Sequence, residues 1–260
     1  MAHKRKHSQE RHWLNREYGG MPGWGFVVAG LVFIGVGGLW AVKSGEPAPG
    51  STWTPPVKVE ASASPEPTHS ATPPSVAFLG DSYTVGAGTS DDAHAGRWTA
   101  VVAEDLGWRA STYARGGTGY VNDGGEDAAY ATRVDAIIDA EPDIVVVSGG
   151  RNDSYFAPVD VEAAALDVFR TLRLGLPDAQ VVVLGSWWDD DEPTSEYTAV
   201  REAIASAAEA AGVAYVDAGE PLVGHPELIS DDGVHPNDAG YVALAHAAEA
   251  ALVGAGIVEG

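Results

Sequence analysis

One serine, one histidine and one aspartate occur in this chain in contexts that suit acyl transfer. Ser82 lies in the stretch GDSY, directly after a short apolar run, and His235 follows Asp232 in the sequence DGVH. A serine hydroxyl is a weak nucleophile until a base accepts its proton and a third group orients that base. The Asp-x-x-His spacing lets the Asp232 carboxylate approach Nδ1 of His235, which leaves Nε2 free to accept the Ser82 proton. On its own, the same spacing is also common in surface turns.

Acyl transfer also requires hydrogen-bond donors that face the developing oxyanion. The backbone N–H of Ser82 is one candidate. The glycines of the stretch GGTG allow close backbone approach, so Gly117, or alternatively Gly116, is a second candidate. The side-chain amide of Asn152 is a third. Taken singly, the glycines are also consistent with a tight turn, and Asn152 with an Asx turn.

Aromatic residues flank these segments, and five of them are candidates for substrate contact: Tyr83, Tyr120, Tyr155, Trp187 and Trp188. Aromatic rings can stack on a sugar or enclose an acyl chain. The alternative is that these rings only pack the loops against the core.

The candidate residues are far apart in the sequence and need a scaffold that brings them together. Apolar runs predict strands buried on both faces at 76–79, 144–147 and 181–184, with weaker candidates at 109–113 and 213–216. Helical patterns occur between them at about 97–106, 127–139, 160–174, 195–211 and 237–253. This alternation predicts one three-layer α/β/α domain over residues 76–260 with a mainly parallel sheet. The candidate residues follow the strands, at the sheet edge where ligands bind in such folds.

The segment before this domain predicts a membrane anchor. Residues 1–22 contain five Lys or Arg and two acidic residues, and a single transmembrane helix is expected at 23–42, where the 19 apolar residues 24–42 carry no charge. The preceding cations predict a cytoplasmic N-terminus and a catalytic domain outside the membrane. A cleaved signal peptide and secretion are the alternative. Residues 43–75 are rich in Pro, Ser and Thr and predict an extended linker.

The composition of the predicted domain excludes several function classes. From residue 76 onward the chain has eight arginines, no lysine and 32 of its 37 acidic residues, a net charge near −24. Such a charge repels phosphate backbones and argues against nucleic acid as a partner. There is no cysteine, hence no disulfide and no thiolate chemistry. The chain lacks HExxH and P-loop motifs, and the acidic run at 189–192 lacks the alternating spacing of a calcium site. We therefore expect neither a metal nor a cofactor.

The four candidate segments occur in an order that resembles the SGNH (GDSL-type) hydrolase family. Its blocks match Gly80-Asp81-Ser82, then Gly117, then the stretch GRND at 150–153, and finally DGVH at 232–235. The GxSxG signature of the α/β-hydrolases is absent, because residue 84 is a threonine. The resemblance covers nearly all of residues 76–260 and implies a flavodoxin-like α/β/α fold with ester hydrolysis or acyl transfer.

The resemblance also implies roles for individual residues. It implies Ser82 as the nucleophile, His235 as the base and Asp232 as the residue that orients the base. It further implies that the N–H groups of Ser82 and Gly117 and the side chain of Asn152 bind the oxyanion. We expect a serine esterase for short acyl or O-acetyl esters of small molecules or polysaccharides, acting through an acyl-enzyme intermediate. An acyltransferase to a sugar hydroxyl, or a surface module that only binds, are the alternatives.

Overall fold

The computed structural model describes residues 17–18, 21–22, 72–91 and 94–258, and these belong to two separate units of the chain. In the first unit, β1 (Glu17–Tyr18) pairs in antiparallel fashion with β2 (Met21–Pro22). The membrane helix expected at 23–42 lies outside the described residues, as does most of the linker expected at 43–75. Within the ranges that the structure describes, no helix is both long and apolar enough to cross a bilayer.

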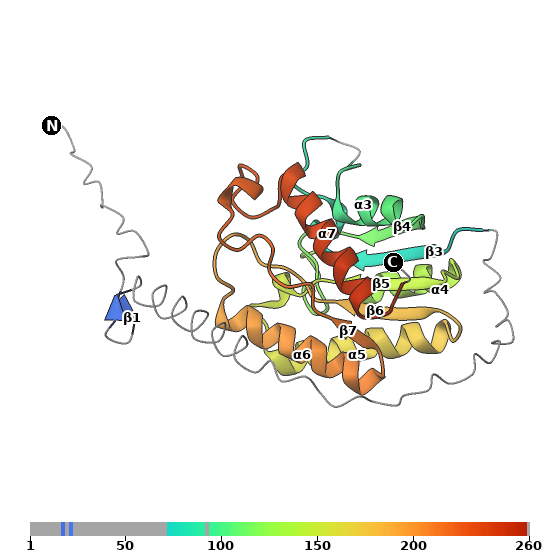
Figure 1. Cartoon of the computed structure of the whole chain (residues 1–260). Helices are drawn as coiled ribbons and strands as arrows, with labels where there is room; N and C mark the ends of the chain where they lie inside the picture. The colour runs from blue at the N-terminus through green and yellow to red at the C-terminus, as the bar shows by residue number, and fades with distance from the viewer. Residues whose placement is uncertain (1–16, 19–20, 23–71, 92–93, 259–260) are drawn as a thin grey trace, which may run out of the picture. The chain divides into compact units, whose positions relative to one another are not determined.

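The second unit is built on a five-stranded sheet whose strands are all parallel (Figure 1). In spatial order the strands are β4 (Arg109–Ala114), β3 (Ser75–Gly80), β5 (Ile144–Ser148), β6 (Gln180–Leu184) and β7 (Ala214–Val216). The chain starts at the second position, adds β4 on one side and then adds β5, β6 and β7 on the other. This is the doubly wound order of flavodoxin-like sheets, and it confirms the predicted parallel α/β fold.

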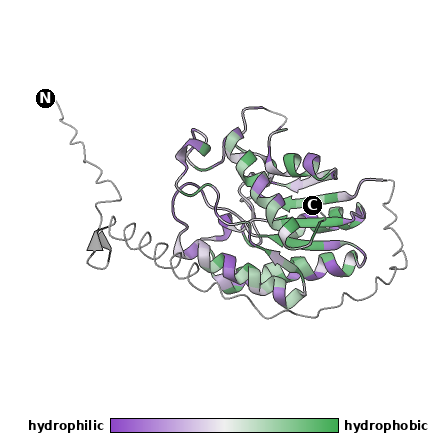
Figure 2. Ribbon diagram, viewed as in Figure 1, coloured by the Kyte–Doolittle hydropathy of each residue, from purple (hydrophilic) through white to green (hydrophobic). Residues whose placement is uncertain are grey.

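Helices cover both faces of this sheet (Figure 1). One face carries α3 (Trp98–Asp105) and α7 (Asp238–Gly254), and the other carries α4 (Val134–Asp139), α5 (Pro158–Gly175) and α6 (Ser195–Ala211). Along β3, Val76 and Phe78 pack toward the first face, whereas Ala77 and Leu79 pack toward the second. Burial on both faces explains why the strands read as continuous apolar runs. Figure 2 shows the sheet as the hydrophobic centre between more polar helix surfaces.

Three short helices lie on the carboxyl side of the strands: α2 (Ser82–Val85), η3 (Arg151–Asp153) and η4 (Pro226–Leu228). Most elements differ from their predicted bounds by one to three residues, and hydrogen bonds explain two of these differences. Ser75, which the sequence analysis assigned to the linker, begins β3, because its N–H and Oγ both donate to Asp143 Oδ2 at 2.7 Å. The helix expected from residue 127 begins only with η2 (Tyr130–Arg133), because the Tyr130 N–H donates to Gly119 O and ties this segment to an earlier loop.

Candidate active site

Ser82, His235 and Asp232 lie together at the carboxyl edge of the sheet. Ser82 is the first residue of α2, directly after β3, and His235 lies in the loop before α7. Ser82 Oγ is 2.9 Å from His235 Nε2, and His235 Nδ1 is 2.6 Å from Asp232 Oδ2. Because Nδ1–H donates to the carboxylate, Nε2 is the nitrogen that accepts the Ser82 hydroxyl proton. This hydrogen-bond chain joins residues 153 positions apart in the sequence.

The loop that carries Asp232 and His235 is held by its own hydrogen bonds. Asp232 Oδ1 accepts the backbone N–H groups of Val234 and His235 at 2.8 and 2.9 Å, and the Ser230 hydroxyl at 2.9 Å. Burial acts to raise the pKa of Asp232, but these donors and the His235 ring together hold that pKa far below its usual range. The Ser230 N–H also donates to His235 O at 2.8 Å. The carboxylate is therefore ionised and fixed against the imidazole at neutral pH.

The candidate glycine donors belong to a loop beside Ser82, and Asn152 is bonded to the same loop. Gly117 has φ of 73°, and a Cβ added to Gly116 would lie 3.6 Å from Ser82 Cβ, so this loop runs against the serine. Asn152, in η3 after β5, donates one amide hydrogen from Nδ2 to Thr118 O at 2.9 Å. That bond orients the amide and leaves its second hydrogen free for a substrate oxygen. The structure thus gathers both glycines and Asn152 at the edge where the sequence predicted them.

Asp81 directly precedes Ser82, and its role in the structure differs from that of Asp232. Its Oδ1 accepts the Tyr83 N–H at 3.0 Å and so caps helix α2. The side chain is buried, and this burial, opposed in part by the bond from Tyr83, raises the pKa of Asp81 to about 6. The carboxylate that accepts the hydrogen bond from the imidazole is that of Asp232, as the Asp-x-x-His spacing predicted.

The five candidate aromatic residues divide into two groups. Tyr83, Tyr120 and Trp187 have only 6%, 3% and 2% of their surface exposed and belong to the two hydrophobic clusters of the core. For these three the structure favours the packing alternative. Trp188 is half-buried, and Tyr155 is 93% exposed. These two remain accessible to a substrate.

An arginine and an aspartate that the sequence analysis did not single out connect the loops after β5 and β6. Arg151 pairs with Asp189 at 2.6 Å, and its guanidinium lies 4.0 Å from the centroid of the Trp188 ring. Arg151 also donates to Tyr83 OH at 3.4 Å, and that hydroxyl donates to Val234 O at 2.7 Å in the Asp232 loop. Asp189 belongs to the acidic run at 189–192, yet it is buried. The sequence did contain one signal for this pair: Arg151 follows β5 and Asp189 follows β6, and these two strands are neighbours in the sheet.

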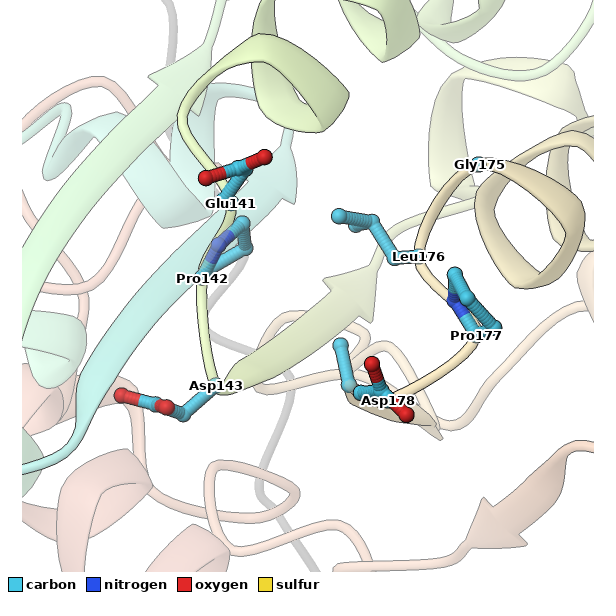
Figure 3. Close-up of a pocket in the computed structure, with 8 residues that line it drawn as sticks. Glu141, Pro142, Asp143, Gly175, Leu176, Pro177 and Asp178 are labelled. Atoms are coloured by element: carbon cyan, nitrogen blue, oxygen red, sulfur yellow. The ribbon is translucent and has the colours of Figure 1, made fainter.

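Two hollows in the described part of the fold differ in their position relative to the candidate site. One, of about 320 Å³, lies between the loops that precede β5 and β6, at the amino edge of the sheet and away from Ser82 (Figure 3). The other, of about 270 Å³, begins two residues after Asn152 and lies between the loop after η3 and the start of α6. It is lined by Ser154, Phe156, Pro158, Ser195, Glu196 and Ala199. Of these two, the second adjoins the candidate site in sequence. Across residues 72–91 and 94–258, no three His, Asp or Glu side chains are grouped as metal ligands.

A doubly wound α/β/α domain with a hydrogen-bonded serine, histidine and aspartate at the carboxyl edge of its sheet has the architecture of a serine hydrolase. The profile of the GDSL-like lipase/acylhydrolase family matches residues 78–243, and the chain belongs to this family. A GDSL lipase of Mycobacterium tuberculosis is 33% identical over 179 residues, which cover 65% of this chain and 78% of that lipase.

Solved structures of similar fold include several esterases. A family two carbohydrate esterase from Clostridium thermocellum, solved in complex with cellohexaose, superposes with a TM-score of 0.59 at 18% identity, over 71% of this chain and 65% of that one. The esterase EstA from Pseudoalteromonas has a TM-score of 0.57 at 13% identity, over 71% of this chain and 100% of that one. TesA has a TM-score of 0.56 at 19% identity, over 68% and 97% of the two chains. The chain is thus an SGNH-type serine ester hydrolase.

Proposed function

We propose that this enzyme hydrolyses carboxylic esters through an acyl-enzyme intermediate, with Ser82 as nucleophile, His235 as general base and Asp232 as the residue that orients the base. The observation that carries this assignment is the continuous hydrogen-bond chain from Ser82 Oγ through His235 to Asp232. A nucleophile within hydrogen-bond reach of a base, which a third group holds in place, is the arrangement that activates serine.

The reaction proceeds in two halves. Ser82 Oγ attacks the ester carbonyl carbon while its proton passes to His235 Nε2, and a tetrahedral oxyanion forms. The ester C–O bond then breaks, and His235 returns the proton to the leaving alcohol, which leaves an acyl group on Ser82. In the second half, a water molecule gives a proton to His235 and attacks the acyl carbon. The carboxylic acid departs, and Ser82 regains its proton from His235.

The developing oxyanion binds three donors in this proposal. The Ser82 N–H belongs to the first turn of α2, the Gly117 N–H, or alternatively that of Gly116, comes from the loop after β4, and the third donor is the remaining amide hydrogen of Asn152. Donors that are already in place stabilise the charge that develops on the oxygen at a lower free-energy cost, because they need no reorganisation during the reaction. Asn152 meets this condition, since its amide is held by Thr118 O at 2.9 Å.

The substrates that we propose are short acyl esters, and in particular O-acetyl groups on sugars. Exposed Tyr155 and half-buried Trp188 supply aromatic faces near Asn152, and the hollow of about 270 Å³ adjoins the same loop. The carbohydrate esterase of similar fold was solved with cellohexaose, and we extend that substrate class to this chain as part of the proposal. Transfer of the acyl group to a sugar hydroxyl would use the same residues.

We further propose that the catalytic domain is held outside the cytoplasmic membrane by a helix at 23–42 and a linker at 43–75. The support for this is the uncharged stretch of 19 residues and the cations that precede it. Secretion after cleavage of this segment is the alternative.

The enzymatic proposal is tested by the turnover of p-nitrophenyl acetate, butyrate and octanoate, and of acetylated xylose and xylan. We expect the highest kcat/KM with acetate and release of acetate from the sugars, whereas octanoate as the best substrate would contradict the short-acyl assignment. Ser82→Ala should abolish turnover and labelling by a fluorophosphonate. Ser90→Ala removes an exposed serine that is hydrogen-bonded to Asp238, and it should change neither. Full turnover by Ser82→Ala would refute the assignment of the nucleophile, and formation of a new sugar ester with an added acceptor would identify a transferase.

A further inference from the structure

Asp153 is a buried carboxylate that has no part in the mechanism above. It is the last residue of η3, and none of its surface is exposed. Its Oδ2 accepts the N–H of Tyr120 at 2.8 Å, and its Oδ1 accepts the N–H groups of Val121 and Asn122 at 3.0 and 2.8 Å. Three consecutive peptide groups of the loop after β4 therefore converge on one side chain of the loop after β5.

The loop that Asp153 holds is the one that carries the candidate glycine donor. Thr118, next to Gly117, accepts the Asn152 amide at 2.9 Å, and the Asn122 amide donates to Asn152 O at 2.9 Å. These two bonds join the same two loops that the three bonds to Asp153 join. Neither loop has a regular strand pairing to the other, so their separation depends on these side-chain contacts.

The packing around the carboxylate leaves little freedom for this loop. A Cβ added to Gly119 would overlap the Asp153 carboxylate, so the backbone passes directly over it. Burial raises the pKa of Asp153, and the three N–H donors oppose that effect by stabilising the charged form. A fully buried carboxylate is costly unless its oxygens are hydrogen-bonded, and here the bonds come from the loop that it positions.

We propose that Asp153 is a positioning residue that sets the distance and orientation between the Gly117 N–H and the Asn152 amide, and so determines how well the site binds the oxyanion. This inference rests on the proposed function, because it acts through the oxyanion donors named there. Asp153 in this role neither touches the substrate nor exchanges a proton with it.

The first test is Asp153→Asn. The asparagine has nearly the same shape, but its NH2 group would face at least one backbone N–H, so a hydrogen bond is replaced by two opposed donors. A misplacement of the donors on the ångström scale costs up to about 10²-fold in rate, so we expect kcat to fall roughly 10- to 100-fold with KM changed by less than about threefold. Asp143→Asn is the matched control, because Asp143 also accepts a backbone N–H from another segment, that of Ser75, but lies beside the distant hollow of Figure 3. It should leave kcat unchanged.

The second test separates positioning of the donors from a general loss of structure. If Asp153 acts through the oxyanion donors, then Asp153→Asn should have a much smaller effect on kcat when Asn152→Ala is already present. A trifluoromethyl ketone, which forms a tetrahedral adduct with the serine, should inhibit Asp153→Asn more weakly by the factor lost in kcat/KM. Additive effects in the double variant, or unchanged inhibition by the ketone, would overturn the proposal.

A third variant keeps the proposal testable if Asp153→Asn does not fold. Gly119→Ala retains the carboxylate but forces it away from the loop, and we expect the same fall in kcat with little change in KM. Wild-type kcat in a folded Gly119→Ala would overturn the inference. The proposed function fails separately, if the wild type has no esterase activity or Ser82→Ala retains it. An active wild type, an inactive Ser82→Ala and a fully active Asp153→Asn would refute only the role of Asp153.

Discussion

Replacing Asp81 with asparagine should make the folded protein more stable at neutral pH, although it removes a charged residue beside the nucleophile. Asp81 is buried, and its Oδ1 caps α2 by accepting the Tyr83 N–H. Asparagine is as good as aspartate at the start of a helix, so Asp81→Asn keeps this bond. What the variant removes is the need to bury a negative charge when the pH rises.

The size and sign of the effect follow from the pKa of Asp81, which burial raises from an ordinary 3.8 to about 6. Below pH 4 the group is protonated in both the folded and the unfolded state. Between pH 4 and 6 the unfolded chain loses the proton while the folded protein keeps it, so the free energy of unfolding of the wild type declines as the pH rises. Above pH 6 the decline is complete and amounts to roughly 3 kcal/mol. Asp81→Asn does not titrate and should escape this loss.

The measurement is thermal unfolding of the wild type and Asp81→Asn at several pH values from 4 to 7.5, followed by circular dichroism. The Tm of the variant relative to that of the wild type should increase by roughly 6–12 °C across this range. Asp143→Asn is the control of opposite sign, because hydrogen bonds from Ser75 lower the pKa of Asp143. The Asp143 carboxylate adds stability that is present above about pH 4 and lost only in stronger acid, so that variant should be less stable than the wild type by a nearly constant amount from pH 4 to 7.5. A difference in Tm between Asp81→Asn and the wild type that stays the same from pH 4 to 7.5 would refute this explanation.

Three further predictions concern the site and its supporting ion pair. Asn152→Ala should lower kcat by roughly 10²–10³-fold with little change in KM, as steady-state kinetics would show, and a smaller loss would assign Asn152 to the turn. Asp232→Asn should lower kcat on the order of 10⁴-fold while the circular dichroism spectrum stays that of the wild type, and near-normal activity would remove Asp232 from the mechanism. Arg151→Met leaves Asp189 buried without its partner and should cost about 3 kcal/mol in urea unfolding. Arg151→Met combined with Asp189→Leu should recover most of that loss, and equal or greater destabilisation in the double variant would contradict a buried ion pair.

The parallel fold could be predicted from the sequence because its signals are local. Strands buried on both faces are apolar at nearly every position, so a segment of only a few residues is enough to recognise one. Such segments occur at 76–79, 144–147 and 181–184. The pairing of Asp232 with His235 was predictable for the same reason, since both residues lie in one short loop. The start of the helix near residue 130 was not predictable, because it depends on a hydrogen bond from Tyr130 to Gly119, which belongs to a different loop.

The sequence by itself determined which residue types follow each strand, and the doubly wound topology is what brings them to one edge of the sheet. Whether an aromatic or acidic residue of those loops faces solvent or the core was decided only by tertiary packing. Trp187 and Trp188 are neighbours with the same side chain, yet the first is buried in the core and the second is half-exposed under Arg151. The ion pair of Arg151 with Asp189 and the three bonds to Asp153 likewise join segments about 30 to 40 residues apart. Contacts of this kind depend on where two loops meet in space, and the sequence pattern within either loop does not predict its contacts with the other.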